Sequence, residues 1–154
     1  MALSNHDLEQ LAAKNGITIN GIYVLDQIPK VMKNGFYVYN MDNTLSDGSN
    51  GTHWICTLSD NNDCVYFDSF GQPPPLQIIK FISQTHDCYY YNNRQLQNLD
   101  AVSCGKWCIA VAVFVANAKT NMSSAHNLLR VVNHFISQFK DSTKHNEVII
   151  KKVL

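Results

Sequence analysis

Apolar residues that recur at helical spacing predict four helices. The first is expected over Asn5–Lys14, where Ser4 supplies the N-cap, an aspartate follows three residues on, and an Asn-Gly pair ends the helix. The segment Cys104–Ala118 is apolar on nearly all of its faces, which predicts a helix buried in the middle of the domain. A short helix over Leu76–Gln84 and a helix with one apolar stripe, from residue 123 or 124 to residue 140, complete the set.

Runs of aromatic and β-branched residues predict the strands. Two of these runs flank an Asp-Asn-Asn-Asp turn and should form a hairpin. The expected extended segments are Gly21–Asp26, Phe36–Met41, Thr52–Leu58, Cys64–Phe70, Cys88–Tyr91 and Glu147–Ile150. The order helix, strands, buried helix, helix predicts an α+β fold.

The hairpin places a histidine and an aspartate on one face. If Leu58 and Val65 face each other across the two strands, His53 and Asp68 become diagonal neighbours, because side chains alternate between the faces of a sheet. Such neighbours have Cβ atoms about 7 Å apart or less, within reach of a hydrogen bond between imidazole and carboxylate. A carboxylate there would fix the imidazole tautomer and stabilise its charged form. The competing interpretation is a solvated pair on a sheet surface.

A thiol is expected at the N-terminus of the buried helix. Unpaired N–H groups and the positive end of the helix dipole at Cys104 favour the thiolate, the nucleophilic form of cysteine. Only 50 of the 154 residues follow Cys104, too few for a papain-type order, in which the histidine lies roughly 130 or more residues downstream. His126 and His134 lie in the next helix, where structural or surface roles are expected. A base for Cys104 should therefore come from upstream, where His53 is already paired with an acid.

The other four cysteines carry weaker signals. Cys56, Cys64 and Cys108 are interpreted as small buried hydrophobic residues, and Cys88 stays undetermined. Cys104 and Cys108 have the spacing of zinc ligands, but no second compact Cys/His pair accompanies them, so no metal site is expected. Because five cysteines cannot all pair internally, free thiols in a reducing compartment are predicted.

Length and charge narrow the class of protein. The 154 residues predict a single domain over 1–154. Twelve basic and twelve acidic residues give zero formal net charge, so nothing global points toward nucleic acid. The N-terminus has no basic segment followed by an apolar stretch, and the longest apolar run is too short for a bilayer. The chain is therefore expected to be neither secreted nor a membrane protein.

Three separate stretches resemble a known protease family. They are Gly51-Thr52-His53-Trp54, Cys64-Val65-Tyr66-Phe67-Asp68-Ser69-Phe70-Gly71, and Gln97 through Cys104-Gly105. Together they resemble the adenovirus maturation protease and the related SUMO-deconjugating proteases, over about Ser4–Ala116. The chain order His, acid, Gln, Cys is that of the family. The resemblance implies an α+β fold in which a mixed sheet packs on a buried central helix that starts at the catalytic cysteine.

The resemblance also implies a role for each matching residue. Cys104 would attack the scissile carbonyl, His53 would carry the proton to the leaving amine, and Asp68 would orient His53. The adenoviral enzyme has Glu at this last place and the SUMO proteases have Asp, so this chain follows the latter. Gln97 lies seven residues before the cysteine, as in the adenoviral enzyme, and would donate its amide N–H to the oxyanion together with the backbone N–H of Cys104.

Three neighbours of these residues are predicted to border the substrate. Gly51 and Trp54 stand near the histidine in the family motif, and Gly105 would let a substrate backbone approach closely. The hairpin places Trp54 on its apolar face, which points to packing, so Trp54 is included only as a neighbour of the histidine. Family substrates are extended peptides with glycine near the cleaved bond. The sequence itself calls for no cofactor, but the adenoviral enzyme uses DNA and a peptide that bonds to a cysteine as activators. Neutral charge weakens the DNA expectation, and Cys88 is only a loose counterpart of the bonding cysteine.

The function implied by the resemblance is a cysteine endopeptidase that cuts viral capsid or other structural precursors at glycine-containing sites during virion maturation. The small size favours a virophage or a large DNA transposon as the source. Such a protease is expected to be a monomer in the host cytoplasm or nucleus and in the virion. The alternatives are an isopeptidase that removes a ubiquitin-like modifier, and an inactive binding module that keeps the fold.

Overall fold

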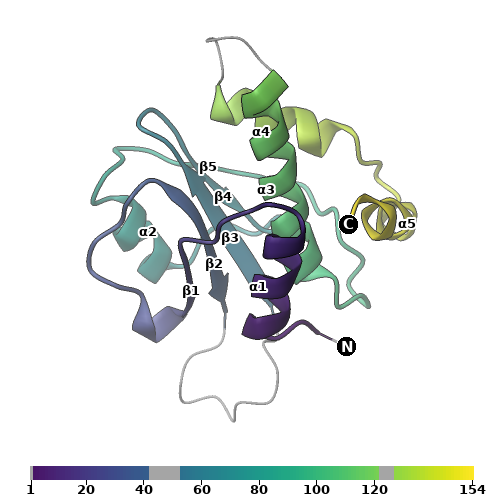
Figure 1. The fold of residues 1–154 in the computed structure, drawn as a ribbon, viewed down its shortest axis with the longest axis horizontal. Coiled ribbons are helices and arrows are strands. Elements are labelled where there is room, and N and C mark those ends of the chain that lie inside the picture. Colours follow the sequence, from purple (N-terminus) through teal and green to yellow (C-terminus); the bar gives the residue numbers. More distant parts are fainter. Residues whose placement is uncertain (1, 42–52, 122–126) are drawn as a thin grey trace.

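A five-stranded mixed sheet lies between helices on both of its faces (Figure 1). The computed structural model describes residues 2–41, 53–121 and 127–154, and only the backbone of 119–121. The strands, in their order across the sheet, are β1 (Gly21–Val24), β2 (Gly35–Asn40), β3 (Trp54–Ser59), β4 (Cys64–Phe67) and β5 (Tyr90–Tyr91). The two outer pairs are parallel and the two inner pairs are antiparallel, which confirms the α+β fold and its mixed sheet.

The helices follow the sequence pattern in most places. They are α1 (Asn5–Lys14), a 3-10 turn η1 (Leu25–Gln27), α2 (Leu76–Ile82), α3 (Cys104–Asn121), α4 (Leu128–Ser137) and α5 (Thr143–Val153). At the start of α1, Ser4 Oγ accepts the Asp7 N–H and the Asp7 carboxylate accepts the Ser4 N–H, so two orphan donors are satisfied reciprocally. The predicted start at residue 123 or 124 lies outside the described residues, and α4 itself begins later than predicted, because Asn127 is its extended N-cap and accepts the Arg130 N–H.

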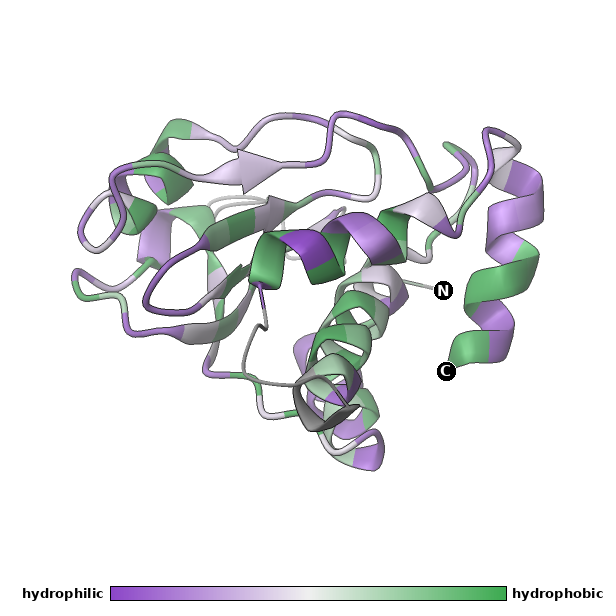
Figure 2. Cartoon of the chain, turned by 90° about the horizontal axis from the view of Figure 1, so that it is seen from above, coloured by the Kyte–Doolittle hydropathy of each residue, from purple (hydrophilic) through white to green (hydrophobic). Residues whose placement is uncertain are grey.

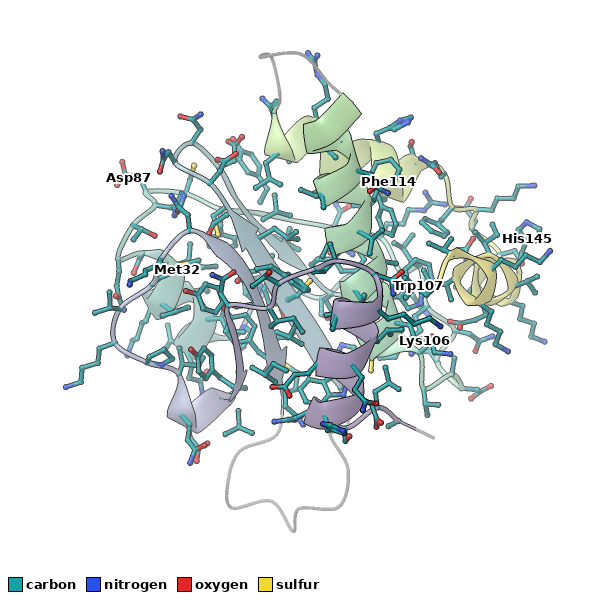
Figure 3. The ribbon with its side chains drawn as sticks, viewed as in Figure 1. Met32, Asp87, Lys106, Trp107, Phe114 and His145 are labelled. Atoms are coloured by element: carbon teal, nitrogen blue, oxygen red, sulfur yellow. The ribbon has the colours of Figure 1, made fainter. Side chains whose placement is uncertain are left out.

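Both faces of the sheet are buried, each against different helices. The face toward α1, α3 and α4 carries Val38, Trp54, Cys56, Leu58, Val65 and Phe67. Figure 3 labels Trp107 and Phe114 on α3, and their rings lie 6.4 and 5.5 Å from the ring of Phe135 on α4. The opposite face packs Tyr37, Tyr39, Ile55 and Tyr66 against α2. Within the described ranges, no helix has the length and apolar character that crossing a membrane requires.

The predicted final strand over Glu147–Ile150 is wrong, because this segment lies inside α5. Its β-branched residues suggested a strand, but a helix is started by Ser142, whose Oγ accepts the His145 N–H at 3.3 Å. Asn146 and Ile150, four residues apart, form the buried face of α5. In Figure 2, α5 lies beside the label C and carries both hydrophobic and hydrophilic residues, as a helix covered on one side does.

The turn after β4 depends on one glycine. Gly71 has a φ of +75°, and its N–H donates to the Asp68 carbonyl at 2.8 Å. A Cβ at this position would lie 2.7 Å from the carbonyl carbon of Arg94, which is backbone and cannot swing aside. Gly16 has a similar φ of +70°, but nothing lies within 4 Å of its Cβ position.

We expect Gly71→Ala to lower the free energy of unfolding clearly more than Gly16→Ala. The left-handed conformation costs an alanine about 1–2 kcal/mol at either position, and only the Gly71 variant adds the clash with Arg94. Chemical denaturation of both variants measures the difference. Equal destabilisation would show that the turn can move away from Arg94 without loss.

Candidate active site

The β3–β4 hairpin brings His53 and Asp68 together. Leu58 faces Val65 across the hairpin, so the predicted register is confirmed. His53 directly precedes β3 and Asp68 directly follows β4. His53 Nε2 lies 2.6 Å from Asp68 Oδ1, and the side chains are 14% and 3% exposed. The competing interpretation of a solvated surface pair is therefore wrong.

Asp68 is fixed through its side chain and its backbone. Its Oδ1 also accepts the Phe70 N–H at 2.9 Å. Its N–H donates to Asn92 Oδ1 at 2.9 Å, and its carbonyl accepts a hydrogen bond from Asn92 Nδ2. The ring of Phe70 stacks on His53, with centroids 4.6 Å apart. The imidazole is thus held from its edge by the carboxylate and from one face by an aromatic ring.

Cys104 is the first residue of α3 and lies beside this pair. The carbonyl of Ser103 accepts the Trp107 N–H, which leaves the earlier N–H groups of the first turn without intrahelical partners. The backbone N–H of Trp54 donates to Cys104 Sγ at 3.3 Å. This N–H and the helix dipole both stabilise negative charge on the sulfur. His53 Nδ1, the ring nitrogen not used by Asp68, is buried and has no hydrogen-bond partner among the described residues.

The charge state of His53 depends on opposing influences on the pKa of its imidazole. Burial lowers the pKa of its imidazole, but the hydrogen bond to Asp68, the interaction with the Cys104 side chain and the charges of both groups raise it more, to about 9. A pKa of about 9 makes His53 an imidazolium at neutral pH, with Asp68 and Cys104 as its interacting neighbours. Such a cation favours the thiolate form of a neighbouring cysteine.

Gln97 is buried in the loop that leads to Cys104. Its side chain is 1% exposed, its Oε1 accepts the Ser69 hydroxyl at 2.6 Å, and its Nε2 donates to the Ala101 carbonyl at 2.8 Å. The amide nitrogen carries two hydrogens, so one remains for another acceptor. The part that Gln97 plays in an oxyanion hole stays a prediction.

The three predicted substrate neighbours have different surroundings. The Trp54 side chain is 1% exposed, and its Nε1 donates to the Leu3 carbonyl at 2.9 Å. A Cβ on Gly105 would lie 3.0 Å from a Leu8 methyl, so the absence of a side chain there lets α1 pack against α3. Gly51 lies outside the described residues. Substrate contact at these three positions stays a prediction.

Burial alone does not distinguish Cys104 from the remaining cysteines, because Cys104 is buried like Cys56, Cys64 and Cys108. All five are free thiols, and Cys88 is exposed. Burial raises the pKa of Cys64 to about 12 and the pKa of Cys108 well above its usual value, so neither thiol ionises readily. In the described ranges, no group of three or more His, Cys, Asp or Glu side chains is arranged to hold a metal ion.

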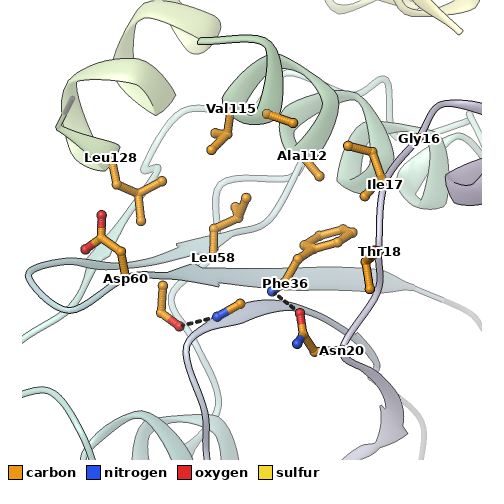
Figure 4. Close-up of a pocket in the computed structure, with 13 residues that line it drawn as sticks. Gly16, Ile17, Thr18, Asn20, Phe36, Leu58, Asp60, Ala112, Val115 and Leu128 are labelled. Atoms are coloured by element: carbon orange, nitrogen blue, oxygen red, sulfur yellow. Dashed lines mark hydrogen bonds between the residues drawn. The ribbon is translucent and has the colours of Figure 1, made fainter. Parts of the chain in front are cut away.

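Two hollows near α3 differ in their relation to the site. The pocket of about 230 Å³ in Figure 4 is lined by Ala112 and Val115, which lie roughly 12–17 Å along the helix axis from its first residue. That pocket is therefore separate from the candidate site. Another hollow, of about 370 Å³, is lined by Ala101, Val102 and Ser103, the residues immediately before Cys104.

Sequence reasoning missed two residues that hold this site. Asn92 opens a polar loop and pairs with the backbone of Asp68, a role that no spacing in the sequence reveals. Ser69 is part of the quoted motif, but its partner is 28 residues away, so only the fold brings them together. The backbone N–H of Trp54 was also not anticipated as a partner of the sulfur.

We expect Asp68→Asn to lower the pKa of His53 from about 9, because burial, which lowers it, remains while the carboxylate, which raises it, is lost. A folded-state pKa above the usual 6.5 gives stabilisation that is fully present below pH 6.5 and is lost as the pH rises through 9. Asp68→Asn should flatten this loss. NMR titration of the His53 ring proton and denaturation at several pH values measure both effects.

The exposed Asp87, labelled in Figure 3, gives the control Asp87→Asn. Equal titration of His53 in both variants would contradict the assignment of Asp68 as the carboxylate that raises its pKa.

The chain shares its fold with a solved viral protease. A crystal structure of the pS273R protease of the virus ASFV superposes with a TM-score of 0.51 at 17% identity, covering 94% of this chain and 64% of that chain. Its selenomethionine form gives a TM-score of 0.39 at 19% identity, over 63% and 37% of the two chains. This chain thus spans 64% or less of the length of that protease. No protein-family model and no curated protein matches the sequence. The fold is that of the SUMO-protease-like cysteine proteases.

Proposed function

We propose that this chain is a viral cysteine peptidase, with Cys104 as nucleophile, His53 as acid and base, and Asp68 as orienting carboxylate. The observation that carries the proposal is the bond of 2.6 Å between His53 Nε2 and Asp68 Oδ1, with the Cys104 side chain beside the same imidazole. A histidine oriented by a carboxylate and adjacent to a thiol at a helix N-terminus is the arrangement that activates a cysteine nucleophile. The fold shared with the ASFV protease supports the same chemistry.

The reaction follows from this geometry in two steps. The Cys104 thiolate attacks the scissile carbonyl carbon, so a C–S bond forms and the carbonyl electrons move to oxygen. As the oxyanion collapses, the C–N bond breaks, and the His53 imidazolium gives its proton to the leaving amine. A water molecule then attacks the thioester, His53 accepts a water proton, and the acid product leaves as Cys104 and His53 return to their starting state.

The oxyanion would be stabilised by two N–H donors. One is the second amide hydrogen of Gln97 Nε2, since the first is bonded to the Ala101 carbonyl. The other is the backbone N–H of Cys104 at the start of α3, where the helix dipole adds a positive partial charge. Donors fixed in advance in a buried site stabilise the developing charge without reorganisation.

The substrate we propose is a viral structural precursor, such as a capsid protein, cut at glycine-containing sites during virion maturation. Support comes from the resemblance to the adenovirus protease, and the hollow of about 370 Å³ beside Ser103 could receive part of a chain bound at Cys104. The same resemblance supports a virophage or large DNA transposon as the source. It also supports a monomer that acts in the host cytoplasm or nucleus and in the virion, and a peptide or DNA activator.

We expect Cys104→Ala to abolish cleavage, with at least about a thousandfold loss of kcat, while the variant stays folded. The measurement is mass spectrometry of a glycine-rich peptide library and of an isopeptide-linked ubiquitin-like conjugate, each incubated with wild type and variant. Cys88→Ala, at the exposed cysteine, should keep full activity. Unchanged cleavage by Cys104→Ala would remove the nucleophile assignment. Cleavage of the conjugate alone would identify a deconjugase, and a wild type that cleaves neither would identify a binding module.

A further inference from the structure

Two successive residues after β4 hold two different parts of the candidate site. Asp68 binds His53, and Ser69 binds Gln97 through a hydroxyl donor 2.6 Å from Oε1. Both Ser69 and Gln97 are 1% exposed, so water does not compete for this hydrogen bond. Two adjacent residues, Asp68 and Ser69, therefore position the proposed base His53 and the proposed oxyanion donor Gln97.

The orientation of the Gln97 amide matters because its two ends have opposite polarity. Only the Nε2 end can stabilise an oxyanion, whereas the Oε1 end would repel it. The Ala101 carbonyl is an acceptor and therefore requires Nε2 on its side. The Ser69 hydroxyl donates to Oε1 on the other side. Together the two contacts leave one Nε2 hydrogen for a third partner.

Loss of the Ser69 hydroxyl would leave Oε1 of Gln97 buried without a donor. A buried acceptor without a donor is unfavourable, so the amide would be driven to rotate toward other N–H groups. The backbone N–H groups nearest to Gln97 in the sequence belong to the loop that leads to Cys104. This loop is also the region that offers N–H donors to an oxyanion. Rotation would therefore withdraw one donor from the oxyanion.

We propose that Ser69 is the positioning residue that orients the Gln97 amide for oxyanion stabilisation. This inference rests on the proposed peptidase function. Ser69 acts through Gln97 and touches no reacting atom. Its backbone is held separately, because its carbonyl accepts the N–H groups of Leu96 and Gln97 at 2.9 and 3.0 Å. A side-chain substitution therefore removes the hydroxyl and leaves these backbone bonds in place.

The test compares Ser69→Ala, Gln97→Ala and the double variant in the full chain, with a peptide that the wild type cleaves. Loss of one oxyanion donor lowers kcat by about 10²–10³-fold, so Gln97→Ala should fall in that range. Ser69→Ala should lose roughly tenfold or more in kcat with KM nearly unchanged, and the double variant should match Gln97→Ala. Ser83→Ala, which removes an exposed hydroxyl bonded to the Lys80 carbonyl, is the control and should keep full activity.

A second measurement separates this inference from the function on which it rests. A peptide aldehyde adds to the thiol and forms an oxyanion-like adduct, whereas iodoacetamide alkylates the thiol without one. Ser69→Ala should weaken aldehyde binding about tenfold and leave the rate of Cys104 alkylation unchanged.

Normal kcat and aldehyde binding in Ser69→Ala, or losses that add to those of Gln97→Ala, would overturn the role of Ser69. Absence of cleavage and aldehyde binding in the wild type would overturn the peptidase function itself. If Ser69→Ala does not fold, Ser69→Cys, a weaker donor of similar size, is judged by the same criteria.

Discussion

The pairing of β3 with β4 is the constraint on which the candidate site depends. His53 and Asp68 lie just beyond the paired residues, so the separation of imidazole and carboxylate is set by the register of Leu58 against Val65. A shift of one residue would move one of the two side chains to the opposite face. Both faces are buried under helices, so such a slip would also exchange two sets of core residues. The cost of repacking the core therefore protects the geometry of the site.

Burial and neighbouring charges have opposite effects on the pKa of His53. Removing the His53 imidazole from water disfavours its cation, yet the pKa is raised to about 9 because the ring interacts with both Asp68 and Cys104. A histidine buried to the same degree without these neighbours would be neutral at neutral pH. The carboxylate thus does more than orient the ring, because it also keeps the ring in the form that stabilises a thiolate. The Trp54 N–H gives the sulfur a second stabilising contact that does not depend on pH.

The sequence predicted elements wherever local chemistry and tertiary packing agree. The capping box at Ser4, the hairpin and the apolar α3 are examples, and the hairpin also predicted the juxtaposition of His53 with Asp68. The strand predicted over Glu147–Ile150 was wrong. The β-branched residues of this segment favour a strand, but an N-cap and one buried face make it part of a helix. Contacts such as that of Asn92 with the Asp68 backbone join distant loops, and no local pattern encodes them.

The misassigned helix α5 explains how an irregular loop can hold a site of this kind. The loop from Asn98 to Ser103 has no strand or helix of its own, so its polar groups need partners from elsewhere. Glu147 accepts the Asn98 N–H through one carboxylate oxygen and the Ser103 hydroxyl through the other, at 3.1 and 2.7 Å. One side chain of α5 therefore fixes both ends of the loop that contains Ala101, the acceptor for Gln97. The Gln97 amide, the proposed oxyanion donor, is thus held by Ser69 from the turn after β4 and, through this loop, by the C-terminal helix.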